Sequence, residues 1–142
     1  GLSWYTILVK RENFRVAFDS FNYKKIEAYS PGKIDELMLN AGIIRNKLKI
    51  LATINNAQQF LKIQKEFGSF STYIWAFVDG KPILNRPKTL KDVAATTEIS
   101  DLLAKDLKKR GFKFLGSTTV YAFMQATGMV NDHVEDCHCR NI

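Results

Sequence analysis

Apolar residues recur every three to four positions along most of this chain, which is the spacing of one face of an α-helix. A helix is predicted from about residue 12 to residue 21, and a much longer one from about Arg45 to Glu66. The apolar stripe expected on the longer helix consists of Leu48, Leu51, Ile54, Ala57, Phe60, Leu61, Ile63 and Phe67. Both stripes predict faces that pack against other helices.

Residues that start and stop helices mark the boundaries of three further elements. Ser30 followed by Pro31 predicts a helix that runs to Asn40, because serine caps a helix and proline suits its first position. Thr97 predicts the start of a helix that continues through Arg110, with Leu102, Leu103 and Leu107 on its inner face. Ser117 is expected to cap a final helix that reaches Thr127 and stops at Gly128.

Three segments are less clearly patterned. Residues 3–9 are short and apolar and fit a strand or a helix, whereas residues 70–78 fit a helix despite their many aromatic side chains. Residues 81–91 contain two prolines and are expected to form a loop. Since the chain has no repeat and no glycine- or proline-rich linker, residues 1–142 are expected to form a single all-α domain of helices packed on helices.

Charge and cysteine content narrow the class of protein. The 142 residues include 21 Lys and Arg against 14 Asp and Glu, so the net charge of +7 suits a nucleic acid partner but also an ordinary solvated surface. The two cysteines, Cys137 and Cys139, form no disulfide framework, and there is no secretory signal, so a cytoplasmic location is expected. No apolar run approaches the ~20 residues of a membrane span, and no membrane partner is expected.

The stretch KKRGFKFLGSTT, residues 108–119, is the most informative for chemistry. Gly116 would allow a ligand to approach the backbone, and the N–H groups of Ser117, Thr118 and Thr119 at the start of the last helix would bind an anion. Four basic side chains surround this turn, so a DNA phosphate would fit there. Alternatively, the lysines only complement the dipole of the preceding helix and the glycines only end helices.

This turn resembles the hairpin of the helix-hairpin-helix DNA glycosylase superfamily. The segments GLSWYTILVKRENF, NAGIIRNKLKI and LKKRGFKFLGSTTVYAFMQATGMVNDH resemble, in order and spacing, the DNA-3-methyladenine glycosylase I family, over essentially the whole chain. The resemblance implies a helix-hairpin-helix at about residues 98–128 and a zinc-ligand tail at residues 131–142. It also implies base excision repair of alkylated double-stranded DNA, in which 3-methyladenine is flipped out and released, leaving an abasic site.

The resemblance also assigns binding residues. Trp4 matches the tryptophan that stacks on the flipped base, although without the resemblance it could equally be a core aromatic, as Trp75 is expected to be. Leu2 would lie near the vacated base position. The DNA-binding residues would further include Lys113, Gly116, Ser117 and Thr118.

Thr118 also bears on the type of glycosylase. Members of the superfamily that cleave the DNA backbone carry a nucleophilic lysine at the position of Thr118, so its hydroxyl indicates a monofunctional hydrolase.

The resemblance assigns no catalytic residue within this sequence. The glutamate that recognises the adenine edge in the family belongs to a segment upstream of Gly1, and the chain is expected to lack this N-terminal segment. Asp132 lies near the place of a catalytic aspartate in other superfamily members, but a structural role is expected for it here.

A metal site is expected at the tail. His133 and Cys137 are four residues apart, so an imidazole and a thiolate on one helical turn could face one zinc ion. Such a pair also occurs as an ordinary histidine and a free thiol. In the family, these positions join an upstream Cys and His in a structural zinc site, so this sequence would hold two of the four Zn²⁺ ligands.

Two other functions remain open from the residues. One is a non-catalytic helix-hairpin-helix module that binds DNA without releasing a base. The other is a helical interaction protein that uses the aromatic segment FSTYIWAFV as its partner surface. The family analogy further predicts a monomer.

Overall fold

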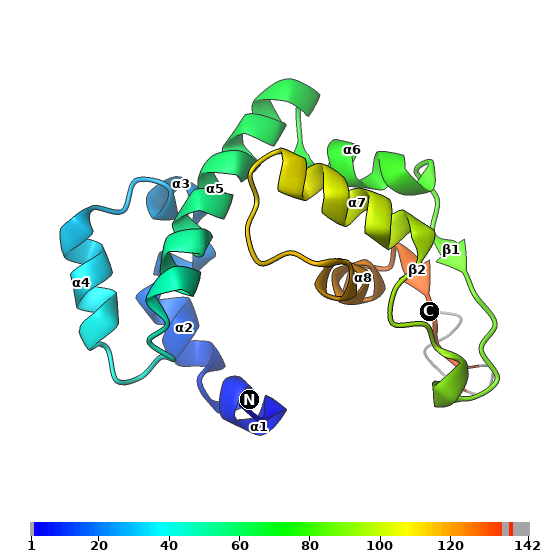
Figure 1. The fold of residues 1–142 in the computed structure, drawn as a ribbon, viewed down its shortest axis with the longest axis horizontal. Helices are drawn as coiled ribbons and strands as arrows, with labels where there is room; N and C mark the ends of the chain where they lie inside the picture. Colours follow the sequence, from blue (N-terminus) through cyan, green and yellow to red (C-terminus); the bar gives the residue numbers. More distant parts are fainter. Residues whose placement is uncertain (1, 135–136, 138–142) are drawn as a thin grey trace. The chain divides into compact units, whose positions relative to one another are not determined.

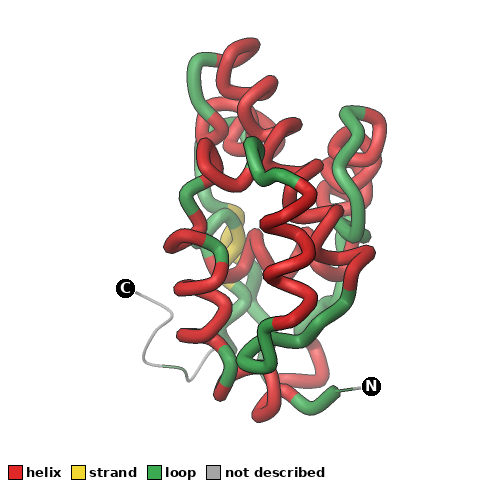
Figure 2. The backbone as a smooth tube through the Cα atoms, turned by 90° about the vertical axis from the view of Figure 1, so that its left-hand side faces the viewer, coloured by secondary structure: helices red, strands yellow, loops and turns green. Residues whose placement is uncertain are grey.

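A computed structural model describes residues 2–134 and 137. The chain divides into two compact units, of which unit 1 comprises the residues up to Lys62 together with Gly111–Phe114. Unit 2 comprises Ile63–Arg110 and the residues from Leu115 onward. Figure 2 shows that helices make up most of the described backbone and that strands form only a short pair, which confirms the predicted helical fold.

Figure 1 labels the α-helices and the two strands, which follow one another along the chain together with three short 3-10 helices, η1 to η3. The first part of the chain contains α1 (Trp4–Val9), α2 (Arg11–Ala17), η1 (Asp19–Phe21), α3 (Tyr23–Ile26), α4 (Pro31–Leu39) and α5 (Lys47–Phe67). The second part contains α6 (Phe70–Trp75), η2 (Ala76–Val78), β1 (Ile83–Leu84), η3 (Leu90–Asp92), α7 (Glu98–Lys109), α8 (Ser117–Ala126) and β2 (Val130–Asn131). Among the described residues, no helix is long and apolar enough to span a membrane.

Two predicted helix starts are confirmed by their caps. The Oγ of Ser30 accepts a hydrogen bond from the backbone N–H of Lys33, and Pro31 occupies the first turn of α4. Thr97 caps α7 in a capping box with Ser100, in which each side chain accepts from the backbone N–H of the other residue. Local side-chain chemistry therefore defines these two boundaries.

The core of unit 1 is built from the inner faces of α2, α4 and α5. Phe18, Leu37, Ile50 and Ile54 are all buried there. The predicted inner stripe of α5 is partly wrong, because Leu48 is 69% exposed and Leu51 is 40% exposed. Ile54, Ala57 and Ile63 of the predicted stripe are buried, and α5 also buries Ile50 and Ala52, which lie outside that stripe.

In unit 2, α7 and α8 pack against each other (Figure 1). Leu103 and Leu107 of α7 and Tyr121 and Met124 of α8 are buried between the elements of this unit. Leu102 was predicted to face inward but is 54% exposed, because one residue along a helix turns the side chain by about 100°.

The predicted loop at residues 81–91 contains a strand. β1 pairs in parallel with β2, with Ile83 opposite Val130, and the N–H of Ile83 donates to the carbonyl of Met129 at 2.8 Å. A strand of two residues is too short to show the alternation of apolar and polar positions that marks a strand, so the sequence could not reveal this pairing. The predicted helix at residues 70–78 is confirmed as α6 and η2, but Trp75 is only half-buried rather than a core residue.

Candidate functional site

The hairpin loop, defined here as Gly111–Phe114, has an unusual backbone. Gly111 has a φ of +96°, and a Cβ atom at this position would lie 3.3 Å from the side chain of Gln59. The φ favours glycine, because L residues rarely adopt it, and a Cβ would also require the Gln59 side chain to shift by a few tenths of an ångström. Phe114 has a φ of +63° although it is not a glycine, so the surroundings must hold this residue in place.

Two adjacent asparagines of α5 hold this loop. Asn55 Nδ2 donates to the carbonyl of Gly111 at 2.7 Å. Asn56 Nδ2 donates to the carbonyl of Lys113 at 3.0 Å, and the N–H of Lys113 donates back to Asn56 Oδ1 at 2.9 Å. The Nζ of Lys49 lies 5.8 Å from the ring centroid of Phe114. The hydrophobic pattern did not single out either asparagine, although two poor helix formers in the middle of a long helix are a signal in retrospect.

The start of α8 has a different cap from the predicted one. Gly116 is the N-cap, with extended backbone, and makes no side-chain hydrogen bond to the first N–H groups of the helix. Ser117 was predicted as the cap but is the first helical residue, and its Oγ shares a hydrogen bond of 2.7 Å with the Oγ of Ser100. A Cβ at Gly116 would meet nothing within 4 Å. The N–H groups of Ser117 and Thr118 thus have no side-chain cap, as an anion site requires.

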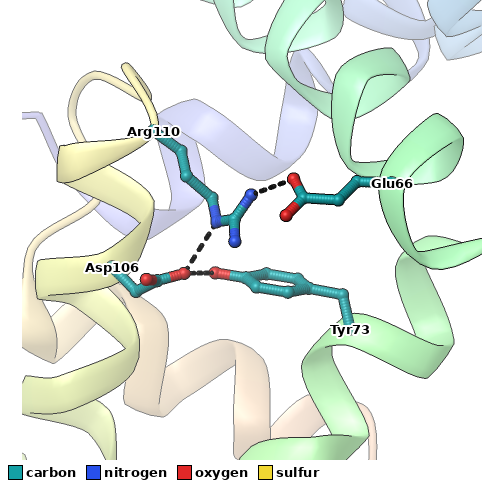
Figure 3. A network of polar contacts seen from close by, with 4 residues as sticks. All are labelled: Glu66, Tyr73, Asp106 and Arg110. Carbon is teal, nitrogen blue, oxygen red and sulfur yellow. Dashed lines mark hydrogen bonds and ion pairs between the residues drawn. The ribbon is translucent and has the colours of Figure 1, made fainter.

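The last turn of α7 carries a network of polar contacts, which Figure 3 shows. Arg110 donates from Nε to Asp106 at 2.9 Å and from Nη1 to Glu66 at 2.7 Å. The hydroxyl of Tyr73 donates to the same oxygen of Asp106. The guanidinium also lies 5.0 Å from the ring centroids of Phe67 and Tyr73. Arg110 therefore ties α7 to α6 and to the last turn of α5.

This network fixes the charge states of its members. Burial would raise the pKa of Asp106, but hydrogen bonds from Tyr73 and Arg110 outweigh it and hold this pKa below its usual value. Burial and the neighbouring carboxylate raise the pKa of Tyr73, so the phenol stays neutral. Arg110 was counted among four basic side chains around the hairpin, but two carboxylates already neutralise its charge. Its role is structural.

Trp4 is exposed rather than part of the core. Ser3 caps α1 by accepting from the N–H of Thr6 at 3.1 Å, and no residue of α1 is buried. The side chain of Trp4 is 83% exposed, which excludes the alternative of a core aromatic within the described chain. Leu2 lines an apolar cavity of about 280 Å³ in unit 1, together with Ile7, Phe14, Phe18, Phe21, Ile44, Asn46, Lys49, Ile50 and Thr53. Trp4 is not among the lining residues of that cavity.

Asp132 has the surroundings of a structural residue. Its carboxylate accepts hydrogen bonds from the Tyr121 hydroxyl, from Asn85 Nδ2 and, at 3.0 Å, from Gln125 Nε2. Burial would raise the pKa of Asp132, but these hydrogen bonds lower it below its usual value. The carboxylate thus links α8 to the segments that follow β1 and β2, in agreement with the role expected from the sequence.

The two predicted metal ligands lie close together. His133 Nδ1 and Cys137 Sγ are 3.7 Å apart, and two such ligands of one tetrahedral zinc ion would be about 3.6 Å apart. The donor types and their separation therefore fit zinc. Among residues 2–134 and 137, no group of three or more His, Cys, Asp or Glu side chains could hold a metal ion. The rest of the predicted zinc-ligand tail, including His138 and Cys139, lies outside the described residues.

Comparison with known proteins places the chain in a family. The family model described as methyladenine glycosylase matches residues 1–141. The DNA-3-methyladenine glycosylase of Haemophilus influenzae is 49% identical over 140 residues, covering 99% of this chain and 76% of the relative. DNA-3-methyladenine glycosylase 1 of Escherichia coli is 45% identical over 139 residues, covering 98% of this chain and 74% of the relative.

Solved structures agree with these relatives. A crystal structure of 3-methyladenine DNA glycosylase I superposes with a TM-score of 0.91 at 47% identity, covering 98% of this chain and 76% of that one. A variant of 3-methyladenine DNA glycosylase I in complex with 3-methyladenine superposes with a TM-score of 0.93 at 39% identity, covering 99% of this chain and 75% of that one. The predicted resemblance is confirmed, and this chain belongs to the methyladenine glycosylase family.

Proposed function

We propose that this protein is a DNA-3-methyladenine glycosylase, which hydrolyses the N-glycosidic bond between 3-methyladenine and deoxyribose in alkylated double-stranded DNA. The observation that carries the proposal is membership of the methyladenine glycosylase family over nearly the whole chain. A relative that superposes with a TM-score of 0.93 has been solved with 3-methyladenine bound. The products are the free base and an abasic site, the substrate of later steps of base excision repair.

The chemistry of the substrate limits what the protein must supply. Methylation at N3 places a positive charge on adenine, so the base can leave without first being protonated. The enzyme then has to hold the flipped nucleotide, stabilise the positive charge that develops on the sugar, and admit water. Flipping costs a few kcal/mol, and less for a damaged base than for a normal one.

Trp4 is the proposed base-binding residue. Its indole is 83% exposed at the start of α1, so one face is available to a ligand without rearrangement of a core. A cationic purine over an indole gains stacking and cation–π energy together, ~1–3 kcal/mol. Neutral adenine gains only the stacking part, which favours the methylated base over the normal one.

The N-terminus of α8 is the proposed contact with a DNA phosphate. Gly116 leaves open space beside the backbone, and the N–H groups of Ser117 and Thr118 have no side-chain cap. Lys113, three residues before Gly116 in the chain, is exposed and is proposed as a further DNA-binding residue. These contacts would be independent of base sequence, as a repair enzyme that searches DNA requires. Leu2, exposed beside α1, is proposed to lie near the vacated base position.

Thr118 supports a monofunctional enzyme. A hydroxyl cannot form the Schiff base by which a lysine at this position would cleave the DNA backbone. The abasic strand should therefore stay intact after the base has left.

His133 and Cys137 are proposed to hold a structural Zn²⁺. Their nitrogen and sulfur atoms are 3.7 Å apart, which suits neighbouring ligands of one tetrahedral ion. When bound, the zinc would cross-link segments of the chain and would take no part in the hydrolysis.

The test is release of free base from duplex DNA that carries isotopically labelled methyl groups. Liquid chromatography should detect labelled 3-methyladenine, and an aldehyde-reactive probe should detect an equal number of abasic sites in unbroken strands. Salt-dependent DNA binding without base release would instead identify a non-catalytic binding module, for which Trp4→Ala would leave the affinity unchanged. A lack of preference for DNA over other polyanions would favour the helical interaction protein.

A further inference from the structure

The hairpin loop Gly111–Phe114 is bound to α5 by main-chain contacts of an unusual kind. The amide group of Asn56 both donates to the carbonyl of Lys113 and accepts from its N–H, at 3.0 and 2.9 Å. This is the pair of hydrogen bonds that a neighbouring β-strand would make. Asn55 binds the carbonyl of Gly111 at 2.7 Å. Two consecutive side chains of one helix therefore satisfy three main-chain groups of a four-residue loop.

Asn55 and Asn56 do not stabilise α5, the helix that carries them. Asparagine is a poor helix former, because its side chain competes for backbone hydrogen bonds. Both side chains are half-buried in the middle of α5, where an apolar residue would favour the helix more. Their contribution is therefore made to the hairpin loop.

The loop needs such support, because apolar contacts hold only part of it. Phe112 is 8% exposed and anchors the loop, but Phe114 is 57% exposed and has a φ of +63°. A non-glycine residue in this region is strained and persists only when its surroundings hold it. One buried ring anchors the loop at Phe112 but leaves the main chain on either side free to turn. The hydrogen bonds to Gly111 and Lys113 remove that freedom.

We propose that Asn56, assisted by Asn55, is a positioning residue for DNA binding. This inference rests on the proposed function, in which Lys113 of the hairpin loop contributes positive charge to DNA binding. Asn56 touches neither the base nor the phosphate. It fixes the main chain at Lys113, so that the loop is already in its DNA-binding conformation before the duplex arrives. Without the hydrogen bonds from the two asparagines, only a fraction of the molecules would have the hairpin loop in its DNA-binding conformation. The apparent Kd for DNA would then rise by the inverse of that fraction.

The test compares Asn56→Ala with Gln58→Ala in the protein. Gln58 lies on the same turn of α5, and its Nε2 donates to the carbonyl of Glu27 at 3.3 Å, so this control removes an amide-to-carbonyl hydrogen bond that does not involve the hairpin. Kd for a methylated duplex is measured by fluorescence anisotropy at several salt concentrations, and KM and kcat are measured by release of 3-methyladenine. Hydrogen exchange at the Lys113 N–H reports the order of the loop independently of DNA.

For Asn56→Ala, we expect Kd and KM to rise about tenfold, with kcat within about twofold of the wild type. Exchange at Lys113 should accelerate, whereas the slope of log Kd against log salt concentration should stay the same, because the competent molecules make the same phosphate contacts as the wild type. Gln58→Ala should leave all five quantities within about twofold of the wild type. If Asn56→Ala does not fold, Asn55→Ala tests the same inference through one hydrogen bond, with an expected rise of about threefold.

Two results would overturn the inference and are distinct from failure of the proposed function. Faster exchange at Lys113 with unchanged Kd would show that the asparagines are merely structural. An equal rise in Kd for Gln58→Ala would show that any loss of stability in α5 has the same effect. If the wild type binds DNA but releases no base, the proposed function fails, while the change in Kd still decides the role of Asn56. If the wild type does not bind DNA, both fail.

Discussion

Replacing Trp4 with alanine should separate base binding from folding stability, because the indole is almost fully exposed. With 83% of its surface in solvent, about a sixth is covered by protein. A tryptophan that buries all of its ~250 Å² contributes through apolar burial at about 25 cal/mol per Å², so the covered part of Trp4 is worth about 1 kcal/mol at most. The free energy of unfolding should therefore fall by no more than about 1 kcal/mol.

The effect of Trp4→Ala on activity should be larger. Loss of stacking and cation–π energy of ~1–3 kcal/mol corresponds to a reduction of about 5-fold to 150-fold in kcat/KM. Trp4→Phe should be intermediate, since a phenyl ring still stacks but attracts a cation less than an indole does. Both values are measured by release of labelled 3-methyladenine at limiting substrate, and stability is measured by urea denaturation of the same preparations.

Trp75→Ala is the matched control. Trp75 is half-buried in α6, so its removal should lower the free energy of unfolding more than Trp4→Ala does. The kcat/KM of the folded Trp75→Ala protein should equal that of the wild type. The reasoning is refuted if Trp4→Ala retains kcat/KM within about threefold of the wild type, or if it loses more stability than Trp75→Ala.

Three further changes test the hairpin loop, the polar network and the tail. Gly111→Ala should lower the free energy of unfolding, measured by urea denaturation, by about 1–3 kcal/mol, because Gly111 has a φ of +96° and an added Cβ would crowd a side chain of α5. Gly80→Ala is the control: Gly80 has a φ of +75° and nothing within 4 Å of an added Cβ, so its effect reports the backbone strain alone. Because the pKa of Asp106 is lower in the folded than in the unfolded protein, Asp106 stabilises the fold above about pH 4, its pKa in the unfolded chain, and this contribution is lost as the pH falls below that value. Because the pKa of Tyr73 is raised in the folded protein, Tyr73 stabilises the fold below about pH 10, and this contribution is lost as the pH rises above that value. The urea concentration at the midpoint of unfolding should therefore fall at both low and high pH. The fall at low pH should be smaller for Asp106→Asn than for the wild type, and an equal fall in the two proteins would contradict the role of this network. Cys137→Ser should reduce the zinc content, measured by elemental analysis, without abolishing base release, and an unaltered content would argue against a thiolate ligand.

Helix boundaries could be predicted from the sequence where a local side chain defines them. Ser30 and Thr97 cap α4 and α7 as expected, because a cap bonds to a backbone N–H three residues away. Ser117 was predicted by the same rule and is the first helical residue instead, since Gly116 takes the cap position and the Ser117 hydroxyl bonds to Ser100.

The inner faces of helices were less predictable. Leu48 and Leu102 belong to apolar stripes but are exposed, because a helix with several apolar positions offers more than one face and the packing partner selects between them. Within the candidate site, Trp4 was identified through family resemblance, while Asn55 and Asn56 were not identified at all. Their partners lie 56 and 57 residues away in the chain, beyond the reach of any local pattern.

By itself, the sequence determined the helical class, the family and the residue types that bind a cationic base, because these depend on local periodicity and on motifs that are contiguous along the chain. The tertiary structure alone decided which charges are free and which are paired. Arg110 is one of the four basic side chains around the hairpin in the sequence, yet it is held by Glu66 and Asp106 in the folded chain. The tertiary structure also decided that the side-chain amides of Asn55 and Asn56 support the hairpin loop. The physical reason is that hydrogen bonds and ion pairs act over a few ångströms in space, and only folding brings residues that are distant in the chain within that range.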